Sequence, residues 1–155
     1  MNKRILLVDD DEAIRDSIGK VLQHAGYSVS CAGDGEEAIA QVDRHDCDLM
    51  LLDIELPKIN GWEVLDAACT LQPLLPVIIL TSFRDQCEPG AARLADLVLQ
   101  KPPDVAQLLA SIEQLLAAPP EARLARAAYE LTPAHGAGYL KLFPAARKST
   151  TTTTR

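Results

Sequence analysis

Three carboxylates in this chain directly follow two short apolar runs, at positions where they could share a cation. Asp9 and Asp10 come after Ile5-Leu6-Leu7-Val8, and Asp53 closes the run Leu49-Met50-Leu51-Leu52. Carboxylates held close together raise one another's pKa. A hard divalent cation with oxygen ligands, Mg²⁺ rather than Zn²⁺, relieves that repulsion. If the two runs lie side by side, these acids therefore predict a Mg²⁺ site.

A hydroxyl and an ammonium occupy the same kind of position further along the chain. Thr81 follows the apolar run at 76–80, and Lys101 follows the run at 96–100. Beside a metal-bound carboxylate, these two groups would stabilise the charge that spreads over the oxygens of a transferring phosphoryl group. The residue types together predict a site for phosphoryl transfer.

The apolar runs predict the strands, and the stretches between them have the spacing of helices. Four or five large apolar residues between polar ones are typical of strands buried on both faces, as in a parallel sheet covered by helices. Such runs predict strands over residues 5–8, 48–53, 76–80 and 96–100, whereas residues 27–32 alternate between polar and apolar and predict a more peripheral strand. The predicted helices follow Asp11, cover 36–45, end before Pro73, lie within 83–95 with an interruption at 88–90, and cover 105–116. Such short connections must cross over the sheet, so we expect an α/β fold with a doubly wound five-stranded parallel sheet.

A parallel sheet brings the carboxyl ends of its strands to one edge, where open α/β sheets bind ligands. The five polar residues at the predicted strand ends should therefore converge. A helix cap is the alternative explanation for the acidic run, because Asp11 can cap the first helix and Glu12 favours its positive end. That explanation leaves Asp9 and Asp10 without a structural role.

Charge and cysteine content narrow the class of protein. Residues 1–118 hold 9 Lys and Arg against 20 Asp and Glu, a net charge of −11, whereas residues 119–155 carry +4. An acidic body argues against direct DNA binding, because phosphate neutralisation needs clustered Lys and Arg. The cysteines lack the spacing of a Zn²⁺ site and are expected to be small buried hydrophobes in a reducing compartment: Cys31, Cys47, Cys69 and Cys87. The first apolar run is too short for a signal peptide or a membrane span, so we expect a cytoplasmic protein with no membrane partner.

Four motifs occur in order along the first three quarters of the chain. They are Ile-Leu-Leu-Val-Asp-Asp-Asp at 5–11, Leu-Leu-Asp-Ile-Glu-Leu-Pro-Lys-Ile-Asn-Gly at 51–61, Val-Ile-Ile-Leu-Thr-Ser at 77–82 and Lys-Pro at 101–102. Through them, residues 1–118 resemble the receiver domains of response regulators in two-component signalling. The resemblance implies a flavodoxin-like receiver fold of the stand-alone type, with residues 119–155 as a short C-terminal extension. We expect a helix over 121–131 in that extension, followed by mostly flexible chain.

The resemblance also implies a role for each residue at the strand ends. Asp53 resembles the phosphoacceptor, which also binds the metal. Asp10 resembles the direct Mg²⁺ ligand, Asp9 the acid that holds a metal-bound water, and Glu55 the residue whose backbone carbonyl binds the metal. The two residues that resemble the contacts of the phosphoryl oxygens are Thr81 and Lys101.

The family resemblance implies a Mg²⁺-dependent reaction and a partner. Asp53 would accept a phosphoryl group from a sensor histidine kinase or a histidine phosphotransfer protein, and the domain would signal through protein contacts, with a homodimer as one option. It would not be an enzyme beyond catalysing its own phosphorylation and dephosphorylation. The alternative is a phosphorelay shuttle or phosphate sink with no output of its own. A haloacid-dehalogenase-type hydrolase is a third interpretation, but it normally needs an Asp-x-Asp motif, which Asp53-Ile54-Glu55 fits poorly.

Three features depart from the family pattern. Val98 stands where receiver domains usually have Tyr or Phe, and Pro103 stands where an aromatic residue commonly follows Lys-Pro. The interval from Thr81 to Lys101 is about two residues shorter than usual, so we expect a short or distorted fourth helix. These departures leave the phosphorylation chemistry intact and place the usual readout of the phosphorylated state in question.

Overall fold

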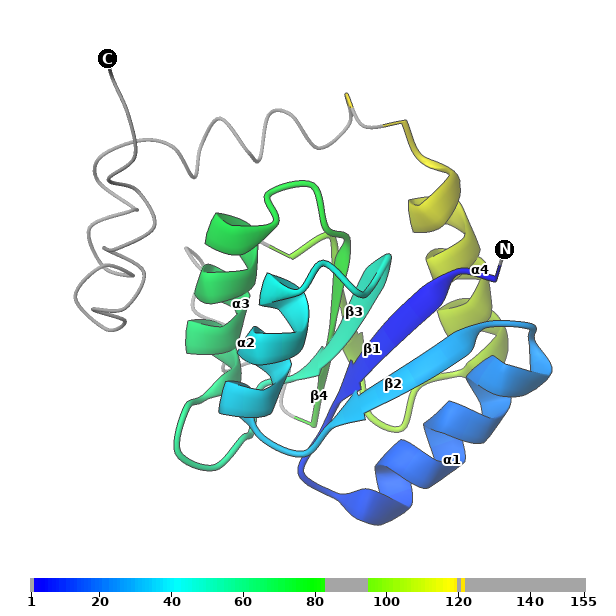
Figure 1. The fold of residues 1–155 in the computed structure, drawn as a ribbon. Coiled ribbons are helices and arrows are strands. Elements are labelled where there is room, and N and C mark those ends of the chain that lie inside the picture. The colour runs from blue at the N-terminus through cyan, green and yellow to red at the C-terminus, as the bar shows by residue number, and fades with distance from the viewer. Residues whose placement is uncertain (1, 83–94, 120, 122–155) are drawn as a thin grey trace.

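The computed structural model describes residues 2–82, 95–119 and 121, in which one sheet lies between two layers of helices (Figure 1). The strands are β1 (Arg4–Val8), β2 (Ser28–Ala32), β3 (Leu49–Asp53), β4 (Val77–Thr81) and β5 (Leu97–Gln100). The helices in the described ranges are α1 (Glu12–His24), α2 (Gly35–Asp43), α3 (Gly61–Leu71) and α4 (Val105–Ala117). None of these helices is long and apolar enough to cross a membrane.

All neighbouring strands pair in parallel, in the order β2-β1-β3-β4-β5. The chain runs outward from β1 to β2 and then returns past β1 to β3, so the direction of winding reverses between β1 and β3. In open α/β sheets, the loops that follow two such strands diverge and leave a crevice outside the carboxyl ends of the strands. Because Val8 pairs with Leu52, Asp9 and Asp53 stand at the same level on either side of this crevice. The predicted doubly wound, flavodoxin-like parallel sheet is confirmed.

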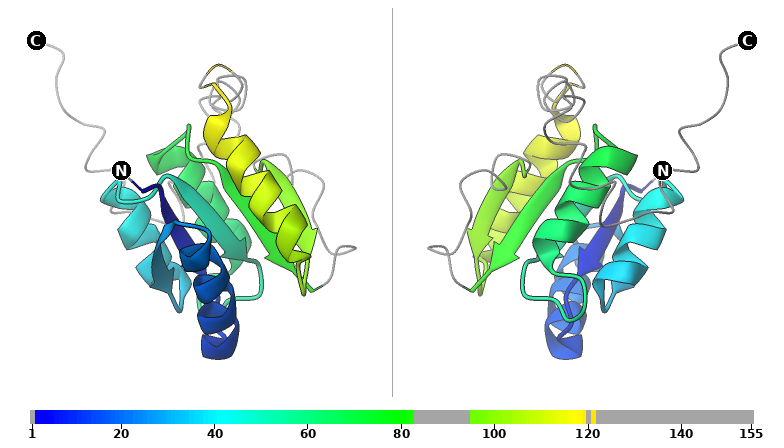
Figure 2. Two further views of the ribbon diagram at one scale, coloured as in Figure 1. Left: turned by 90° about the vertical axis from the view of Figure 1, so that its right-hand side faces the viewer. Right: turned by 90° about the vertical axis from the view of Figure 1, so that its left-hand side faces the viewer.

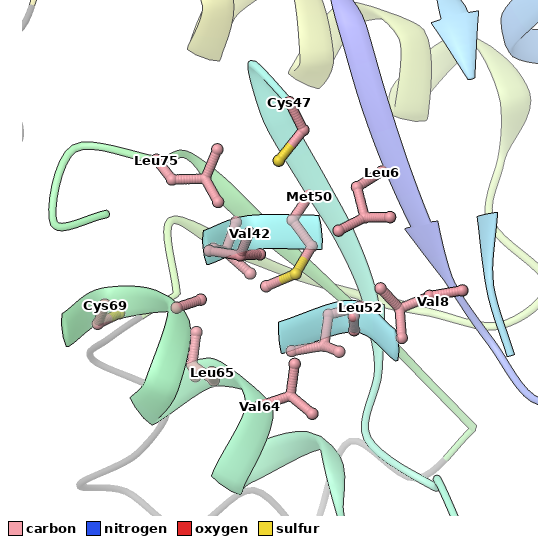
Figure 3. Packing of buried hydrophobic residues seen from close by; sticks show 14 of the residues in the cluster. Leu6, Val8, Val42, Cys47, Met50, Leu52, Val64, Leu65, Cys69 and Leu75 are labelled. Carbon is pink, nitrogen blue, oxygen red and sulfur yellow. The ribbon is translucent and has the colours of Figure 1, made fainter. Parts of the chain in front are cut away.

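Each face of the sheet packs against its own pair of helices (Figure 2). Leu6, Val8 and Leu52 belong to the core beneath α2 and α3, which also contains Val42 of α2 and Val64 of α3 (Figure 3). The alternate residues of the same strands, such as Leu7, belong to a second core beneath α1 and α4. Strands with apolar residues on both faces must lie inside the fold, and this burial holds the strand ends in place.

A side-chain cap begins every helix in the described ranges. Each cap accepts a hydrogen bond from a backbone N–H in the first turn and so satisfies a donor that has no partner within the helix. The caps are Asp11, Asp34, Asn60 and Asp104. The predicted role of Asp11 as a cap is thus confirmed. Because the caps of α1 and α3 lie in the loops that follow β1 and β3, they also constrain the loops at the crevice.

Most element boundaries differ by one or two residues from the sequence-based prediction, and those of α2 and β2 show why. The helix predicted over 36–45 is α2, which ends at Asp43 and is followed by the C-cap residue Arg44. His45 has a φ of +57°, a left-handed conformation that ends the helix. The second strand begins at Ser28 rather than Tyr27. Both differences lie at element ends, where local backbone geometry decides the boundary rather than the apolar pattern.

The prediction for the cysteines is correct for two of them and wrong for a third. Cys47 and Cys69 are buried, and burial raises the pKa of the Cys47 thiol to about 11. Cys31 is exposed, because it lies on the edge strand β2, which is less covered than the central strands. Cys87, the helix predicted within 83–95 and the extension beyond Glu121 fall outside the described residues.

Candidate functional site

The carboxyl edge of the sheet gathers three carboxylates at the crevice between β1 and β3. One carboxylate oxygen from each of Asp9, Asp10 and Asp53 lies within 4.8 Å of the others. Asp9 is 1% exposed and Asp53 is 4% exposed, whereas Asp10 faces solvent. The site is therefore a pair of buried acids with a third acid at its entrance.

Lys101 brings a positive charge to these acids from the end of β5. Its Nζ atom lies 2.5 Å from Asp9 Oδ2 and 3.3 Å from Asp53 Oδ2. The side chain of Lys101 is 12% exposed, so both ion pairs are largely shielded from water. Lys101 thus joins the end of β5 to the ends of β1 and β3.

Backbone N–H groups orient the other oxygens of the two buried acids. The Asp11 N–H donates to Asp9 Oδ1 at 2.9 Å, and the Glu55 N–H donates to Asp53 Oδ1 at 3.1 Å. Each buried carboxylate therefore has one oxygen held by a nearby loop amide and the other turned toward Lys101. This arrangement fixes the direction of both side chains before any ligand arrives.

The charges at the site do not balance. Burial raises the pKa of Asp53 to about 6, and the charge of Asp9 adds to the rise, although the Glu55 N–H and Lys101 oppose it. Burial lowers the pKa of Lys101, but its contacts with Asp9 and Asp53 outweigh that effect and hold the pKa above its usual value. One ammonium facing three carboxylates leaves excess negative charge, which raises the free energy of the ionised site. The hard oxygen donors and this excess charge fit Mg²⁺.

Thr81 and Glu55 also lie at this edge. Thr81 ends β4 and is 4% exposed. Leu80 pairs with Asp53 across the sheet, which places Thr81 one residue beyond the level of Asp53. Glu55 is exposed and contacts Asp53 through its N–H, whereas metal binding by its carbonyl stays a prediction. The fold brings all the residues singled out from the sequence to one edge, and their individual roles remain predictions.

A family model for the response regulator receiver domain matches residues 5–113. The chain belongs to this family. The match favours the receiver interpretation over the hydrolase alternative. Among curated relatives, the response regulator MprA of Mycobacterium leprae is 41% identical over 116 residues, which cover 73% of this chain and 50% of the relative. The receiver chain thus spans about half the length of the curated relatives it matches.

Solved structures share the fold of this receiver domain. A CheY-like receiver domain protein from Methanospirillum hungatei is 34% identical, with a TM-score of 0.69, over 75% of this chain and 94% of the other. The response regulator protein TrrA from Thermotoga maritima, solved in complex with Mg(2+)-BeF, is 33% identical, with a TM-score of 0.69, over 73% of this chain and 98% of the other. The receiver fold is thus shared with proteins of known structure over nearly their whole length.

Two residues near the site carry contacts that sequence analysis missed. The Arg15 guanidinium donates to the backbone carbonyl of Asp9 at 2.6 Å. Gly61 leaves no room for a side chain, because a Cβ there would lie 2.5 Å from the Asp53 carbonyl oxygen and 2.4 Å from Ile54 Cα. A cation in the first turns of a helix, where the dipole disfavours positive charge, was the available signal for Arg15.

Proposed function

We propose that this receiver domain accepts a phosphoryl group on Asp53 from a phosphohistidine of a histidine kinase or histidine phosphotransfer protein, in a Mg²⁺-dependent reaction. The observation that carries the proposal is the convergence of Asp53 with Asp9, Asp10 and Lys101 at the β1–β3 crevice. The family match supports it, because the chain is a receiver domain of two-component response regulators. The domain catalyses its own phosphorylation and dephosphorylation and no other reaction.

The chemistry is the transfer of one phosphoryl group between two side chains. A carboxylate oxygen of Asp53 attacks the phosphorus, so that a P–O bond forms while the P–N bond to the imidazole breaks. The imidazole nitrogen keeps the electron pair of the broken bond and takes up a proton from solvent. In the later hydrolysis, a water oxygen attacks the phosphorus and the bond to Asp53 breaks, which returns the free carboxylate and inorganic phosphate.

The residues at the crevice divide this work between them. Lys101 lies close enough to Asp53 to contact an oxygen of an arriving phosphoryl group, and Thr81 would offer its hydroxyl from the end of β4. Asp9, Asp10, Asp53 and the Glu55 carbonyl would hold Mg²⁺ directly or through water. A bound Mg²⁺ ion supplies positive charge for the oxygens that become more negative during transfer. Burial of Asp53 keeps water away from the reacting atoms.

The test is phosphate-affinity gel mobility after incubation with acetyl phosphate, with and without Mg²⁺. We expect a Mg²⁺-dependent shifted band for the wild type and for Asp46→Asn, which removes the same charge from an exposed side chain before β3. Asp53→Asn should give no shifted band, because an amide cannot accept the phosphoryl group. A shifted band in Asp53→Asn, or none in the wild type with Mg²⁺, would overturn the proposal.

A phosphorelay shuttle or phosphate sink is the second candidate, and Val98 favours it. Val98 is half-buried on β5 and packs against the core beneath α2 and α3, at the position where receivers usually carry an aromatic readout residue. A shuttle or sink should show rapid return of phosphate to histidine or rapid hydrolysis. A long-lived acyl phosphate that changes affinity for a partner would support the switch instead. Cytoplasmic location, a homodimer and the lack of direct DNA binding stay predictions, since the relatives are about twice as long.

A further inference from the structure

Arg15 makes a specific contact with the backbone of the metal-site loop. Its Nη1 atom donates to the carbonyl oxygen of Asp9 at 2.6 Å, and the Arg15 side chain is half-buried. A charged donor at this distance makes one of the stronger hydrogen bonds available to a protein. Among the described residues, no carboxylate forms an ion pair with Arg15. The guanidinium therefore serves the Asp9 carbonyl rather than a surface salt bridge.

The carbonyl that Arg15 holds belongs to the peptide bond between Asp9 and Asp10. A peptide unit is planar, so holding its oxygen fixes the orientation of the whole unit. The Asp9 N–H donates to Ala32 O at 3.1 Å, and both carboxylate oxygens of Asp9 also have partners. With the contact from Arg15, every polar atom of Asp9 is held. Among the described residues, the exposed Asp10 carboxylate has no such set of contacts. The orientation of the Asp9–Asp10 peptide unit therefore governs where the Asp10 side chain leaves the backbone.

Gly33 allows the guanidinium to reach this carbonyl. A Cβ on Gly33 would lie 3.3 Å from Arg15 Nη1 and 3.7 Å from Arg15 Cζ, so the guanidinium passes directly over the glycine. Gly33 follows β2, at the same edge of the sheet as the acids. Its φ is not in the left-handed region, so an alanine there would press on Arg15 without straining the backbone.

The geometry points to Arg15 as a positioning residue for Mg²⁺ binding, which orients Asp9 and Asp10 by holding the peptide between them. This inference rests on the proposed function and adds to it a residue outside the acid cluster. Two effects of Arg15 on Mg²⁺ oppose each other. Its positive charge repels the cation, so removal of the charge alone would tighten binding. Its hold on the peptide preorganises the acids, so removal of the contact would weaken binding. Weaker Mg²⁺ binding in a variant without Arg15 would show that preorganisation is the larger effect, and tighter binding would show that charge repulsion is.

The experiment measures Mg²⁺ affinity without phosphorylation, by calorimetry and by the fluorescence of Trp62, the single tryptophan. We expect Arg15→Gln to weaken Mg²⁺ binding about tenfold and Arg15→Lys, which keeps the charge and one donor, to weaken it less. The matched control is Lys20→Gln, which removes a cation from the exposed face of α1, where Lys20 pairs with Asp16 at 3.3 Å. Equal or tighter binding in Arg15→Gln than in Lys20→Gln would overturn the inference.

Gly33→Ala alone keeps the inference falsifiable if Arg15→Gln folds poorly, and hydrogen exchange in a folded Arg15→Gln adds an independent readout. Gly33→Ala should weaken Mg²⁺ binding about threefold, and it should have no added effect in the Arg15→Gln background if it acts through Arg15. In the metal-free protein, the Asp11 amide, which donates to Asp9 Oδ1, should exchange its hydrogen faster in Arg15→Gln than in Lys20→Gln. Additive effects or unchanged exchange would count against positioning. If the wild type itself binds no Mg²⁺, the proposed function fails together with the inference; a wild type that binds while Arg15→Gln matches the control overturns the inference alone.

Discussion

The two halves of the site edge are built differently. In the β1–β3 half, every residue of Ile5–Val8 and of β3 is buried, and backbone N–H groups hold oxygens of Asp9 and Asp53. In the β4–β5 half, β4 is also buried, but β5 is an edge strand of the described sheet, whose first two residues are half-buried and whose Gln100 is exposed. Lys101 reaches the acids from that half through a long side chain. Packed strands fix the acids, whereas a flexible side chain delivers the positive charge.

The departures from the family pattern at Val98 and Pro103 fall at or just after β5, the less buried strand of the β4–β5 half. Val98 lies within β5, and Pro103 lies between Lys101 and the cap of α4. The acids of the β1–β3 half keep the residue types that the family resemblance implies for a phosphorylation site. We therefore expect the proposed phosphoryl chemistry to depend on the densely packed β1–β3 half, and the response to phosphorylation to differ from that of other receivers on the β5 side. Lys101 is where the two halves meet.

Substitution of Lys101 should have the largest effect, because its side chain makes the contact between the two halves of the site edge. We expect Lys101→Met to slow phosphorylation by acetyl phosphate about 100-fold or more, because a preorganised charge next to the transferred oxygens is lost. Mg²⁺ binding should persist or tighten, since the acids stay in place and a competing cation is gone. Initial rates of shifted-band formation and Mg²⁺ titrations test both points.

Lys20→Met is the control for Lys101→Met, because Lys20 is exposed on α1 and its ion pair with Asp16 lies outside the site. A loss of less than about fivefold in Lys101→Met would mean that the β4–β5 half contributes little to the reaction. A loss of Mg²⁺ binding as well would mean that Lys101, and not the packed strands, positions the acids. Either result would contradict the view that packed strands position the acids while Lys101 supplies the positive charge for the reaction.

Gly61→Ala should disturb the packed half from the side of α3. Its Cβ would lie within 2.5 Å of backbone atoms of Asp53 and Ile54, which have no freedom to rotate away. We expect a loss of about 3 kcal/mol in the free energy of unfolding and slower phosphorylation, because the end of β3 must shift. Denaturant melts and phosphorylation rates measure the two effects.

Gly19 offers a matched substitution on α1. A Cβ there would meet no atom within 4 Å, so Gly19→Ala should stabilise the protein by about 0.5 to 1 kcal/mol through helix propensity. Similar destabilisation by both substitutions would show that the β3 end is no more constrained than an ordinary helix position. The contrast between the two glycines therefore tests how rigid the acid-bearing half is.

The sequence predicts the features that depend on buried strands better than those that depend on long side chains. The buried strands were predictable, because apolar runs such as Leu49–Leu52 fit few structures other than a buried strand. Once the strands were predicted to be parallel, the convergence of the acids at their ends followed. The double pairing of Lys101 and the contact of Arg15 with Asp9 depend on where long side chains end, which spacing does not report. Cys31 was misjudged because the prediction rested on the small apolar side chain of cysteine and not on its place in the alternating, peripheral strand at 27–32.

The smallest expected effect is on the pH dependence of the free energy of unfolding, which tests how the β1–β3 half tolerates the charge of Asp53. The pKa of Asp53 is raised to about 6 in the fold, so its contribution to stability is full below the ordinary Asp pKa and is lost as pH rises through about 6. Asp53→Asn has no carboxyl group to ionise at this position, so its free energy of unfolding does not fall in this way as pH rises. In metal-free buffer we therefore expect Asp53→Asn to become more stable than the wild type as pH rises from 4 to 7, by about 2 kcal/mol at the upper end.

Mg²⁺ should remove most of the difference between the wild type and Asp53→Asn, because a cation at the crevice favours the ionised carboxylate and binds more tightly to the protein that has all three acids than to the one that keeps only Asp9 and Asp10. Denaturant melts across this pH range, with EDTA or with saturating Mg²⁺, measure both effects. A constant difference between the two proteins at all pH values would mean that Asp53 titrates normally and that the buried half tolerates its charge. A pH-dependent difference that Mg²⁺ removes would show that the fold holds Asp53 in a state that only a bound cation relieves.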